Sequence, residues 1–428
     1  MPVKSGSLME RPATNSSSGL NPARSPSRSS SDAFAIPMRA LLAGARKKEP
    51  VLIDRIRRLV RVESPSGNKA AVDACASLTA SLITASPIFG NTARVTLHRQ
   101  RGFSAILEAR FGPRTHPGSP KPLLLLGHLD TVWPLGMLKS MPCRISGGRL
   151  SGPGSLDMKA GVAIALTAVE ILAEARALTR EIILLLTGDE EIGSPVSRPT
   201  IERIAAQCAA VYVLEPAQGL AYKTARKGTA QWRIEIKGVA AHAGVDFEKG
   251  ASALRELARV IETVSNWTDL KRGLTVSAGV AGGGTRINVI PAEAWAEFDV
   301  RIAHRADAPR IVRKFSALKL PAFKLIDRRC TLSVTGGINR PPMERTRSTV
   351  HLFERARTLA HEIGLDLQEA ATGGASDGNF TSALGIPTLD GMGAVGEGAH
   401  ARHESIFIEH LAPRTALLAA MLGAGAPA

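Results

Sequence analysis

The sequence predicts an α/β protein with a mostly parallel sheet, interrupted by a smaller inserted α+β domain. Short apolar segments at residues 123–126, 181–187 and 209–214 are typical of strands buried on both faces of a parallel sheet. Helical patterns lie between these segments. From about residue 228 the pattern changes to half-exposed strands, and α/β character returns after about residue 336.

Length and composition narrow the class of protein. The chain has 428 residues, which is too long for a single core, so two domains are expected. Its net charge of +16 is mostly scattered, and we interpret it as a solvated basic face. Aromatic residues make up only 4%, which argues against a base-stacking surface. The four cysteines form no C-x-x-C pair, and no apolar run approaches the ~20 residues of a membrane span. We therefore expect a cytoplasmic protein without a membrane or nucleic-acid partner.

The N-terminal part of the chain predicts a tail, two helices and two strands. Residues 1–36 are rich in Ser, Pro and Arg without periodicity, so we expect a disordered tail of unknown role. Apolar periodicity predicts helices at 38–62 and 68–85. Strands are expected at 95–97 and 104–109, before the first buried strand.

The segment 123–126 is followed by Gly127-His128-Leu129-Asp130. Since side chains alternate along a strand, His128 and Asp130 should point the same way. An imidazole can bind a metal while a carboxylate holds its other ring nitrogen. Taken alone, the pair is equally typical of a solvated loop at a strand end.

Acidic residues follow the other buried strands and precede a helix. Glu190 and Glu191 follow the strand at 181–187, and Glu215 follows the strand at 209–214. Asp157 stands where a helix N-cap belongs. The carboxyl ends of strands in open α/β sheets form a ligand crevice, so these side chains should share one rim with His128. Their mutual repulsion calls for cations, and oxygen and imidazole donors suit zinc, cobalt or manganese.

The inserted domain has the order β-α-β-β-α-β of a ferredoxin-like unit. The expected elements are a strand at 231–237, a helix at 251–267, strands at 274–280 and 293–303, a helix at 307–318 and a strand at 330–335. The predicted boundaries are 1–36 for the tail, 37–227 and 337–428 for the two parts of the main domain, and 228–336 for the insertion. His242, Asn288, Arg301 and Arg340 would be unremarkable in isolation, while His400 and His403 are both candidate ligands.

Together these motifs resemble one family. The chain carries H-x-D, D-M-K-A-G before a helix, D-E-E-I-G-S, E-P-A, A-H-A-G, G-G-x-S-D and a late G-A-H-x-x-x-E, in this order. This order resembles the dinuclear zinc aminoacylase and carboxypeptidase family, which includes glutamate carboxypeptidase, acetylornithine deacetylase, succinyl-diaminopimelate desuccinylase and peptidase T. The likeness covers about residues 38–425. It implies a zinc-peptidase-type catalytic domain interrupted by a lid and dimerisation domain, as the boundaries above suggest.

The resemblance also implies a metal centre. Asp157 would bridge two zinc ions, one completed by His128 and Glu215 and the other by Glu191 and His400. Cobalt or manganese could replace zinc. His400 is preferred to His403 because the family's histidine stands four residues before a glutamate, here Glu404. Two positions depart from the family pattern. The family more often has an acidic residue at the position of His403, and it usually has a second Gly at the position of Ala160 in D-M-K-A-G.

Further roles follow from the same likeness. Glu190 would be the general base for a metal-bridging hydroxide, and Asp130 would orient His128. His242 would stabilise the oxyanion in the partner's site, which implies a homodimer. The resemblance places three more residues near the substrate, where they suit a free carboxylate: Asn288, Arg301 and Arg340.

We therefore expect a zinc-dependent hydrolase that releases a C-terminal amino acid from a small peptide or amide, as glutamate carboxypeptidase does. The E-P-A stretch and residues 336–344 favour this branch. The alternative is an N-acyl-amino-acid deacylase of the acetylornithine deacetylase or desuccinylase type, which uses the same metal residues. A remote alternative is a non-catalytic or nucleic-acid-associated protein on the same fold, which the intact Glu190 argues against.

Overall fold

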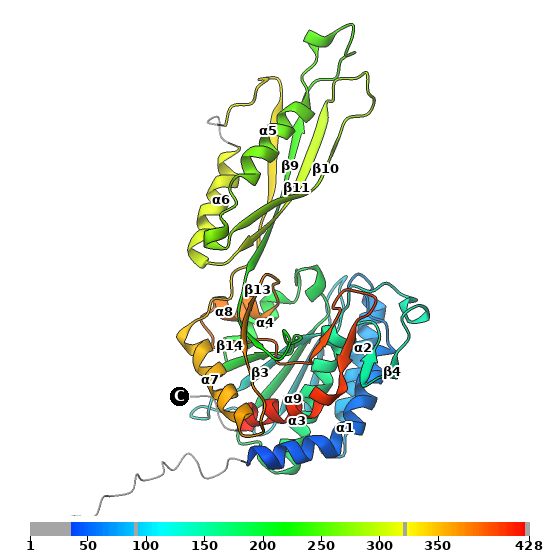
Figure 1. Ribbon diagram of the computed structural model, residues 1–428, viewed down its shortest axis with the longest axis vertical. Coiled ribbons are helices and arrows are strands. Elements are labelled where there is room, and N and C mark those ends of the chain that lie inside the picture. Colours follow the sequence, from blue (N-terminus) through cyan, green and yellow to red (C-terminus); the bar gives the residue numbers. More distant parts are fainter. Residues whose placement is uncertain (1–35, 90–92, 320–322, 424–428) are drawn as a thin grey trace, which may run out of the picture. The chain divides into compact units, whose positions relative to one another are not determined.

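The computed structural model describes residues 36–89, 93–319 and 323–423 (Figure 1). The predicted tail at 1–36 lies outside the described residues apart from Ile36. Among the described residues, none of the helices combines the length and apolar character needed to cross a membrane.

The main sheet has six strands in the order β1-β2-β6-β3-β7-β14. The strands are β1 (Arg94–His98), β2 (Ile106–Phe111), β3 (Leu123–His128), β6 (Ile182–Thr187), β7 (Ala210–Val213) and β14 (Thr388–Leu389). Strands β6, β3, β7 and β14 pair in parallel, whereas β1 and β2 are antiparallel additions at one edge. Every residue of β3, β6 and β7 is buried, as the apolar runs predict. The mostly parallel sheet is therefore confirmed.

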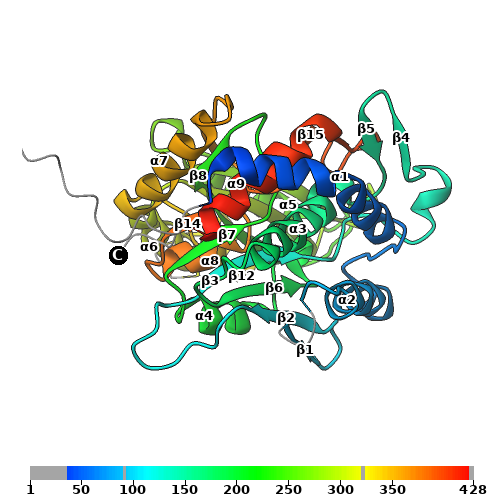
Figure 2. The same ribbon diagram turned by 90° about the horizontal axis from the view of Figure 1, so that it is seen from below.

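Helices cover both faces of this sheet (Figure 2). Alternate residues of β3 enter opposite cores, with Leu123 and Leu125 in one and Leu124 and Leu126 in the other. The first core is formed with α1 (Met38–Val60), α2 (Lys69–Thr84), α3 (Ala160–Glu174), α7 (Arg347–His361) and α9 (Leu411–Gly423). The second core is formed with α4 (Arg198–Ala205) and α8 (Gly378–Ala383). This arrangement leaves the carboxyl ends of β3, β6 and β7 free for functional side chains.

A second sheet is wholly antiparallel, in the order β10-β11-β9-β12. Its elements along the chain are β9 (Gly228–Lys237), α5 (Ala253–Ser265), β10 (Thr275–Gly283), β11 (Glu293–Ile302), α6 (Ala308–Ala317) and β12 (Thr331–Arg340). Both helices pack on one face of this sheet (Figure 1). On this face Phe315 of α6 stacks on Trp232 of β9, with ring centroids 4.0 Å apart. The inserted α+β domain is therefore confirmed as part of the fold.

The two sheets have separate cores, and this separation supports a division into domains. We propose that 37–227 and 337–428 form one domain and 228–336 the other. Strand β12 continues to Arg340, so its last residues lead back to the main domain.

Shorter strands complete the main domain. A small antiparallel sheet joins β4 (Arg144–Ser146), β5 (Arg149–Ser151), β15 (Gly396–Glu397) and β16 (Ser405–Phe407). A parallel pair joins β8 (Tyr222–Arg226) to β13 (Glu369–Thr372). These pairs bring the loop before α3 and the loop between β15 and β16 to the same end of the main sheet.

Candidate metal and catalytic site

The predicted metal ligands lie at the carboxyl ends of three parallel strands and in two loops beside them. His128 ends β3, Glu191 follows β6, and Glu215 follows β7. Asp157 precedes α3, and His400 lies between β15 and β16. The residues come from segments up to 272 positions apart in sequence (400 − 128), and the fold brings all five together.

The carboxylate of Asp157 lies between two imidazoles. Its Oδ1 is 3.3 Å from Nε2 of His128, and its Oδ2 is 3.3 Å from Nε2 of His400. On the first side, Oε1 of Glu215 is 3.5 Å from Nε2 of His128. On the second side, Oε1 of Glu191 is 3.3 Å from Nε2 of His400. The result is two sets of three donors that share Asp157.

Several of these donor atoms are buried without a hydrogen-bond partner. Among the described residues, Nε2 of His128, Oδ1 of Asp157 and Oε1 of Glu191 are in this state. An unpaired buried polar group costs about 1–3 kcal/mol, so three of them side by side indicate a place for a further group. Donor atoms of His128, Asp157 and Glu191 lie within 4.8 Å of one another, as do those of His128, Glu190 and Glu215. Nitrogen and oxygen donors at this spacing fit divalent metal ions.

Without metal, the imidazoles and carboxylates pair with one another. Burial alone would lower the pKa of His128, but the carboxylates of Asp130 and Asp157, 3.4 and 3.3 Å from its ring nitrogens, outweigh it and raise the pKa well above its ordinary value. The carboxylates of Asp157 and Glu191, each 3.3 Å from Nε2 of His400, raise the pKa of this imidazole to about 10. Burial favours a raised pKa for Asp157, yet the two imidazoles close to its carboxylate lower it. Burial raises the pKa of Glu191. The imidazoles and the Asp157 carboxylate thus favour one another's charged forms, whereas burial favours the neutral form of Glu191.

Asp130 holds both His128 and the turn that carries the two glutamates. Nδ1 of His128 lies 3.0 Å from the main-chain oxygen of Asp130 and 3.4 Å from its carboxylate. The carboxylate accepts hydrogen bonds from the backbone N–H groups of Glu190 (3.2 Å) and Glu191 (3.1 Å) and from the hydroxyl of Ser66 (2.7 Å). Asp130 is fully buried, so these bonds fix the glutamates relative to His128.

Glu404 holds the segment that carries Asp157, a role that the sequence analysis missed. It is buried and accepts hydrogen bonds from the backbone N–H groups of Gly154 (3.0 Å), Leu156 (2.8 Å) and Asp157 (3.0 Å). Nε1 of Trp133 donates a fourth, at 2.7 Å. Glu404 is the final residue of the G-A-H-x-x-x-E motif, which could have indicated a role for it. From the sequence, the motif was used only to prefer His400 to His403 as a ligand.

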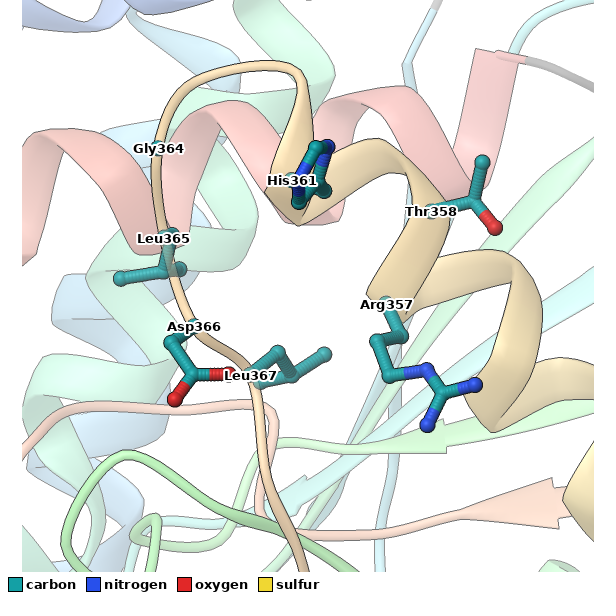
Figure 3. A pocket seen from close by; sticks show the side chains of 7 residues that line it. All are labelled: Arg357, Thr358, His361, Gly364, Leu365, Asp366 and Leu367. Atoms are coloured by element: carbon teal, nitrogen blue, oxygen red, sulfur yellow. The ribbon is translucent and has the colours of Figure 1, made fainter.

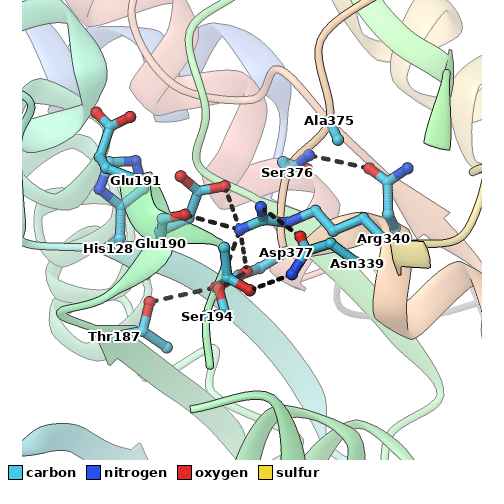
Figure 4. Close-up of polar contacts among 12 residues, drawn as sticks. His128, Thr187, Glu190, Glu191, Ser194, Asn339, Arg340, Ala375, Ser376 and Asp377 are labelled. Carbon is cyan, nitrogen blue, oxygen red and sulfur yellow. Dashed lines mark hydrogen bonds and ion pairs between the residues drawn. The ribbon is translucent and has the colours of Figure 1, made fainter. Parts of the chain in front are cut away.

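Arg340 reaches the predicted general base from the end of β12 (Figure 4). Its Nη2 donates to Oε1 of Glu190 at 2.9 Å, to Oδ1 of Asp377 at 3.0 Å and to the hydroxyl of Ser194 at 3.0 Å. Burial raises the pKa of Glu190 well above its ordinary value, although Arg340 opposes the shift. Asp377, the aspartate of the G-G-x-S-D motif, is a second contact that was not assigned a role from the sequence.

Three other predicted residues lie in the inserted domain. Nδ1 of His242 accepts hydrogen bonds from the backbone N–H groups of Gly244 (3.2 Å) and Val245 (3.1 Å). A neutral His242 therefore carries its proton on Nε2. Arg301 forms a two-pronged pair with Asp299, at 2.8 and 2.9 Å. The main-chain oxygen of Asn288 accepts the N–H of Ala243 at 2.9 Å. Within the described parts of the chain, no hydrogen bond or ion pair joins these three residues to the predicted metal ligands.

His403 takes a different place from His400. It is exposed, and its ring packs against Gly398, where an added Cβ would lie 2.7 Å from a ring carbon. The backbone of His400 has φ of 62°, a left-handed conformation that directs its ring to Asp157 and Glu191. The geometry thus supports His400 as the ligand of the two.

A pocket of about 590 Å³ lies at the end of α7, and no candidate site residue lines it (Figure 3). Its lining residues are Arg357, Thr358, His361, Gly364, Leu365, Asp366 and Leu367. The pocket is separate from the candidate site because none of its lining residues belongs to that site. Arg357 and Asp366 carry opposite charges, so the lining favours no particular class of ligand.

One family model and several known proteins match most of this chain in sequence. A model of peptidase family M20/M25/M40 matches residues 124–424. Carboxypeptidase G2 of Pseudomonas sp. (strain RS-16) is 28% identical over 386 residues, which cover 89% of this chain and 91% of that protein. Succinyl-diaminopimelate desuccinylase of Stenotrophomonas maltophilia (strain R551-3) is 27% identical over 317 residues, which cover 69% and 82%.

Solved structures show the same fold. Aminopeptidase PepT from Bacillus cereus matches with a TM-score of 0.71 and 23% identity, covering 88% of this chain and 98% of that one. An M20 family metallo-carboxypeptidase from Sulfolobus solfataricus matches with a TM-score of 0.66 and 17% identity, covering 87% and 98%. The family resemblance and the fold class predicted from the motifs are both confirmed.

Proposed function

This metallohydrolase chain belongs to peptidase family M20/M25/M40, and from that premise we propose that it cleaves a peptide or amide bond and releases a C-terminal amino acid. The observation that carries the proposal is the carboxylate of Asp157, held between the imidazoles of His128 and His400 at 3.3 Å each. The likeness to carboxypeptidase G2 along 89% of the chain supports the carboxypeptidase branch.

We propose two zinc ions as the metals, with cobalt or manganese as substitutes. His128 and Glu215 would hold one ion, Glu191 and His400 the other, and Asp157 would bind both. Two such ions would lower the pKa of a shared water towards ~7 and polarise the scissile carbonyl.

Glu190 is the proposed general base. It lies beside Glu191, but its carboxylate contacts Arg340 rather than an imidazole. The raised pKa that burial gives it suits a group that takes a proton from water and passes it to the leaving nitrogen. Asp130 supports this role because it holds the backbone N–H of Glu190.

His242 is the proposed donor to the oxyanion. Since its Nδ1 accepts two backbone hydrogen bonds, Nε2–H is its free donor. A homodimer in which His242 of one subunit serves the site of the other is part of this proposal. Sedimentation of the full chain would test it, because a monomer that turns over substrate would exclude such sharing.

We propose a substrate with a free carboxylate, near Asn288, Arg301 and Arg340. A guanidinium clamps a carboxylate with paired hydrogen bonds. Here Arg301 pairs with Asp299, and Arg340 pairs with Glu190 and Asp377. A substrate carboxylate would therefore exchange with these internal partners rather than meet free guanidinium groups.

The second candidate is an N-acyl-amino-acid deacylase, which the likeness to several desuccinylases at 27–30% identity favours. Zinc-loaded protein should be assayed with dipeptides, folyl-type glutamates, N-acyl amino acids, N-acetylornithine and succinylated diamino acids. Release of a C-terminal amino acid from the dipeptides or folyl-type glutamates supports the first candidate, and preference for N-acetylornithine or succinylated diamino acids supports the second. If no substrate in the panel is turned over while two metal ions are bound, both substrate proposals fail. That result would support the alternative of a non-catalytic protein on the same fold.

A cytoplasmic location remains a proposal. The four cysteines are all free, and three of them are buried, which suits a reducing compartment.

A further inference from the structure

Arg226, the last residue of β8, uses every N–H of its buried guanidinium. Nε donates to Oδ2 of Asp390 at 2.8 Å, and Nη2 donates to Oδ1 of Asp390 at 2.5 Å and to Oε2 of Glu215 at 3.2 Å. Nη1 donates to the main-chain oxygens of Gly374 (3.3 Å) and Ala375 (3.4 Å). A guanidinium has five N–H donors in a rigid fork, and all five have acceptors here.

The contact with Arg226 decides which oxygen of Glu215 is free. Oε2 accepts the hydrogen bond from Arg226, while Oε1 lies 3.5 Å from Nε2 of His128. Rotation of the Glu215 carboxylate would break the pair with a buried cation. Arg226 therefore presents one defined oxygen of Glu215 to the side of the centre that contains His128.

The two sides of the centre differ in this support. Glu191 has no arginine partner among the described residues, and its Oε1 is buried without a hydrogen bond. The imidazole beside it, His400, is half exposed. The side formed by His128 and Glu215 is buried and braced, whereas the side formed by Glu191 and His400 is more open.

Arg226 is itself held in place. Asp390, its two-pronged partner, is fully buried and also accepts a hydrogen bond from the hydroxyl of Ser376 at 2.6 Å. The backbone of Arg226 pairs with that of Met343 in both directions, at 2.9 and 3.0 Å. The guanidinium thus connects Glu215 to the loop of Gly374, Ala375 and Ser376.

We propose that Arg226 is a positioning residue that fixes Glu215 for metal binding on the His128 side of the centre and couples that side to the loop at Gly374–Ser376. The inference rests on the proposed dinuclear function. It predicts that a change at Arg226 weakens one of two metal equivalents and spares the other.

The test is a titration of the metal-free full chain with Zn²⁺ in competition with a chelator, for the natural protein and for Arg226→Lys. A lysine keeps the charge but offers three donors from a single point, so it cannot bind two carboxylates and two carbonyls together. We expect one equivalent to bind roughly 10–100-fold more weakly and the other to stay within about threefold, as for loss of a residue that orients a ligand.

Arg414→Lys is the matched control. Arg414 is also fully buried, but its acceptors are the main-chain oxygens of Gly391, Gly393 and Leu220. We expect it to lower stability and leave both zinc affinities near those of the natural protein. The second control is the double variant Arg226→Lys/Glu215→Ala, compared with Glu215→Ala alone. Without the Glu215 carboxylate, Arg226 has lost the group through which it acts. Arg226→Lys should then have little further effect on metal binding.

Three outcomes would overturn the inference: Arg226→Lys leaves both equivalents unchanged, it weakens both equally, or it acts as strongly in the absence of Glu215. If Arg226→Lys does not fold, Ser376→Ala loosens Asp390 and should weaken the same equivalent, by roughly threefold or more. Unchanged affinities in Ser376→Ala would then count against the inference. If the natural protein binds fewer than two equivalents, the proposed dinuclear function fails and this inference fails with it, a result that needs no variant.

Discussion

Arg340 donates a hydrogen bond to the carboxylate of Glu190 across 2.9 Å, so the last residue of the inserted domain's returning strand contacts the proposed general base. The same nitrogen donates to Asp377. Two carboxylates therefore share one buried cation at the point where the chain returns to the main domain. This arrangement gives the carboxylate of Glu190 an ion-pair partner other than an imidazole, although a donor atom of Glu190 lies within 4.8 Å of one of His128.

Glu190→Gln tests that role directly. Glutamine keeps the size and can still accept from Arg340, but it cannot take a proton. We expect kcat to fall by about 10²–10⁴-fold while both metal equivalents stay bound, since general-base catalysis is worth about that factor. Glu262→Gln, an exposed change on α5, is the control and should leave kcat unchanged. A Glu190→Gln protein with near-normal kcat would assign the base to another residue.

The pKa of His400 predicts how zinc binding depends on pH. Its metal-free pKa is raised from 6.5 to about 10 by Asp157 and Glu191, so the ring is protonated at neutral pH. Because only the neutral ring binds metal, zinc uptake must release this proton, and the affinity should rise with pH up to about 10. For the metal-free protein, the stability from these ion pairs is fully present below pH 6.5 and is lost as the pH rises through about 10.

Calorimetry in buffers of different ionisation enthalpy would count the released protons. His400→Asn should release fewer protons and bind one equivalent more weakly, whereas His403→Asn should behave as the natural protein does. The reverse result would show that His403 is the ligand.

The strands that carry the site could be predicted because short, fully apolar runs are typical of strands buried on both faces of a sheet. Leu123–Leu126 is buried on both faces, and a charged residue directly after such a run must lie at the sheet edge. His128, Glu215 and Asp157 could therefore be placed on one rim from local pattern, whereas the family motifs selected His400 over His403 and assigned the ligand roles.

The residues that support this centre could not be predicted in the same way. Glu404 holds Gly154 and Asp157 across about 250 positions of sequence, and no local period reports such a pairing. Arg226 and Asp390 come from distant parts of the chain, and a backbone bridge between Lys223 of β8 and Asp390, which follows β14, brings them together. The strands of two or three residues, such as β15 and β16, are too short to show alternation.

Glu404→Gln tests the support of Asp157. Both carboxylate oxygens of Glu404 accept hydrogen bonds from N–H groups. In glutamine one of these oxygens becomes an NH₂ group, which cannot accept them. The loss of at least one buried hydrogen bond should lower the free energy of unfolding by about 1–3 kcal/mol and weaken both zinc equivalents, because Asp157 is the proposed ligand of both. Urea unfolding and zinc titration are the measurements. Glu397→Gln, which changes an exposed glutamate paired with Arg149, should alter neither quantity.

Asn379→Asp tests the junction between the two proposed domains. Nδ2 of Asn379 donates to the main-chain oxygens of Lys227 (3.2 Å) and Pro341 (2.8 Å), which directly flank β9 and β12. Aspartate removes both donors and places a carboxylate beside two carbonyls in a fully buried position. We expect the free energy of unfolding to fall by about 1–3 kcal/mol and trypsin to cleave faster after Lys227.

The matched control is Gln207→Glu, an amide-to-acid change at an exposed residue whose Nε2 also donates to a main-chain oxygen. It should change stability by less than about 0.5 kcal/mol, as is usual for a surface site. Faster cleavage after Lys227 with an intact inserted domain as the product would locate the opening at this junction. Equal cleavage rates in Asn379→Asp and the natural protein would mean that the two connections are held by their other contacts, such as the backbone pair between Arg226 and Met343.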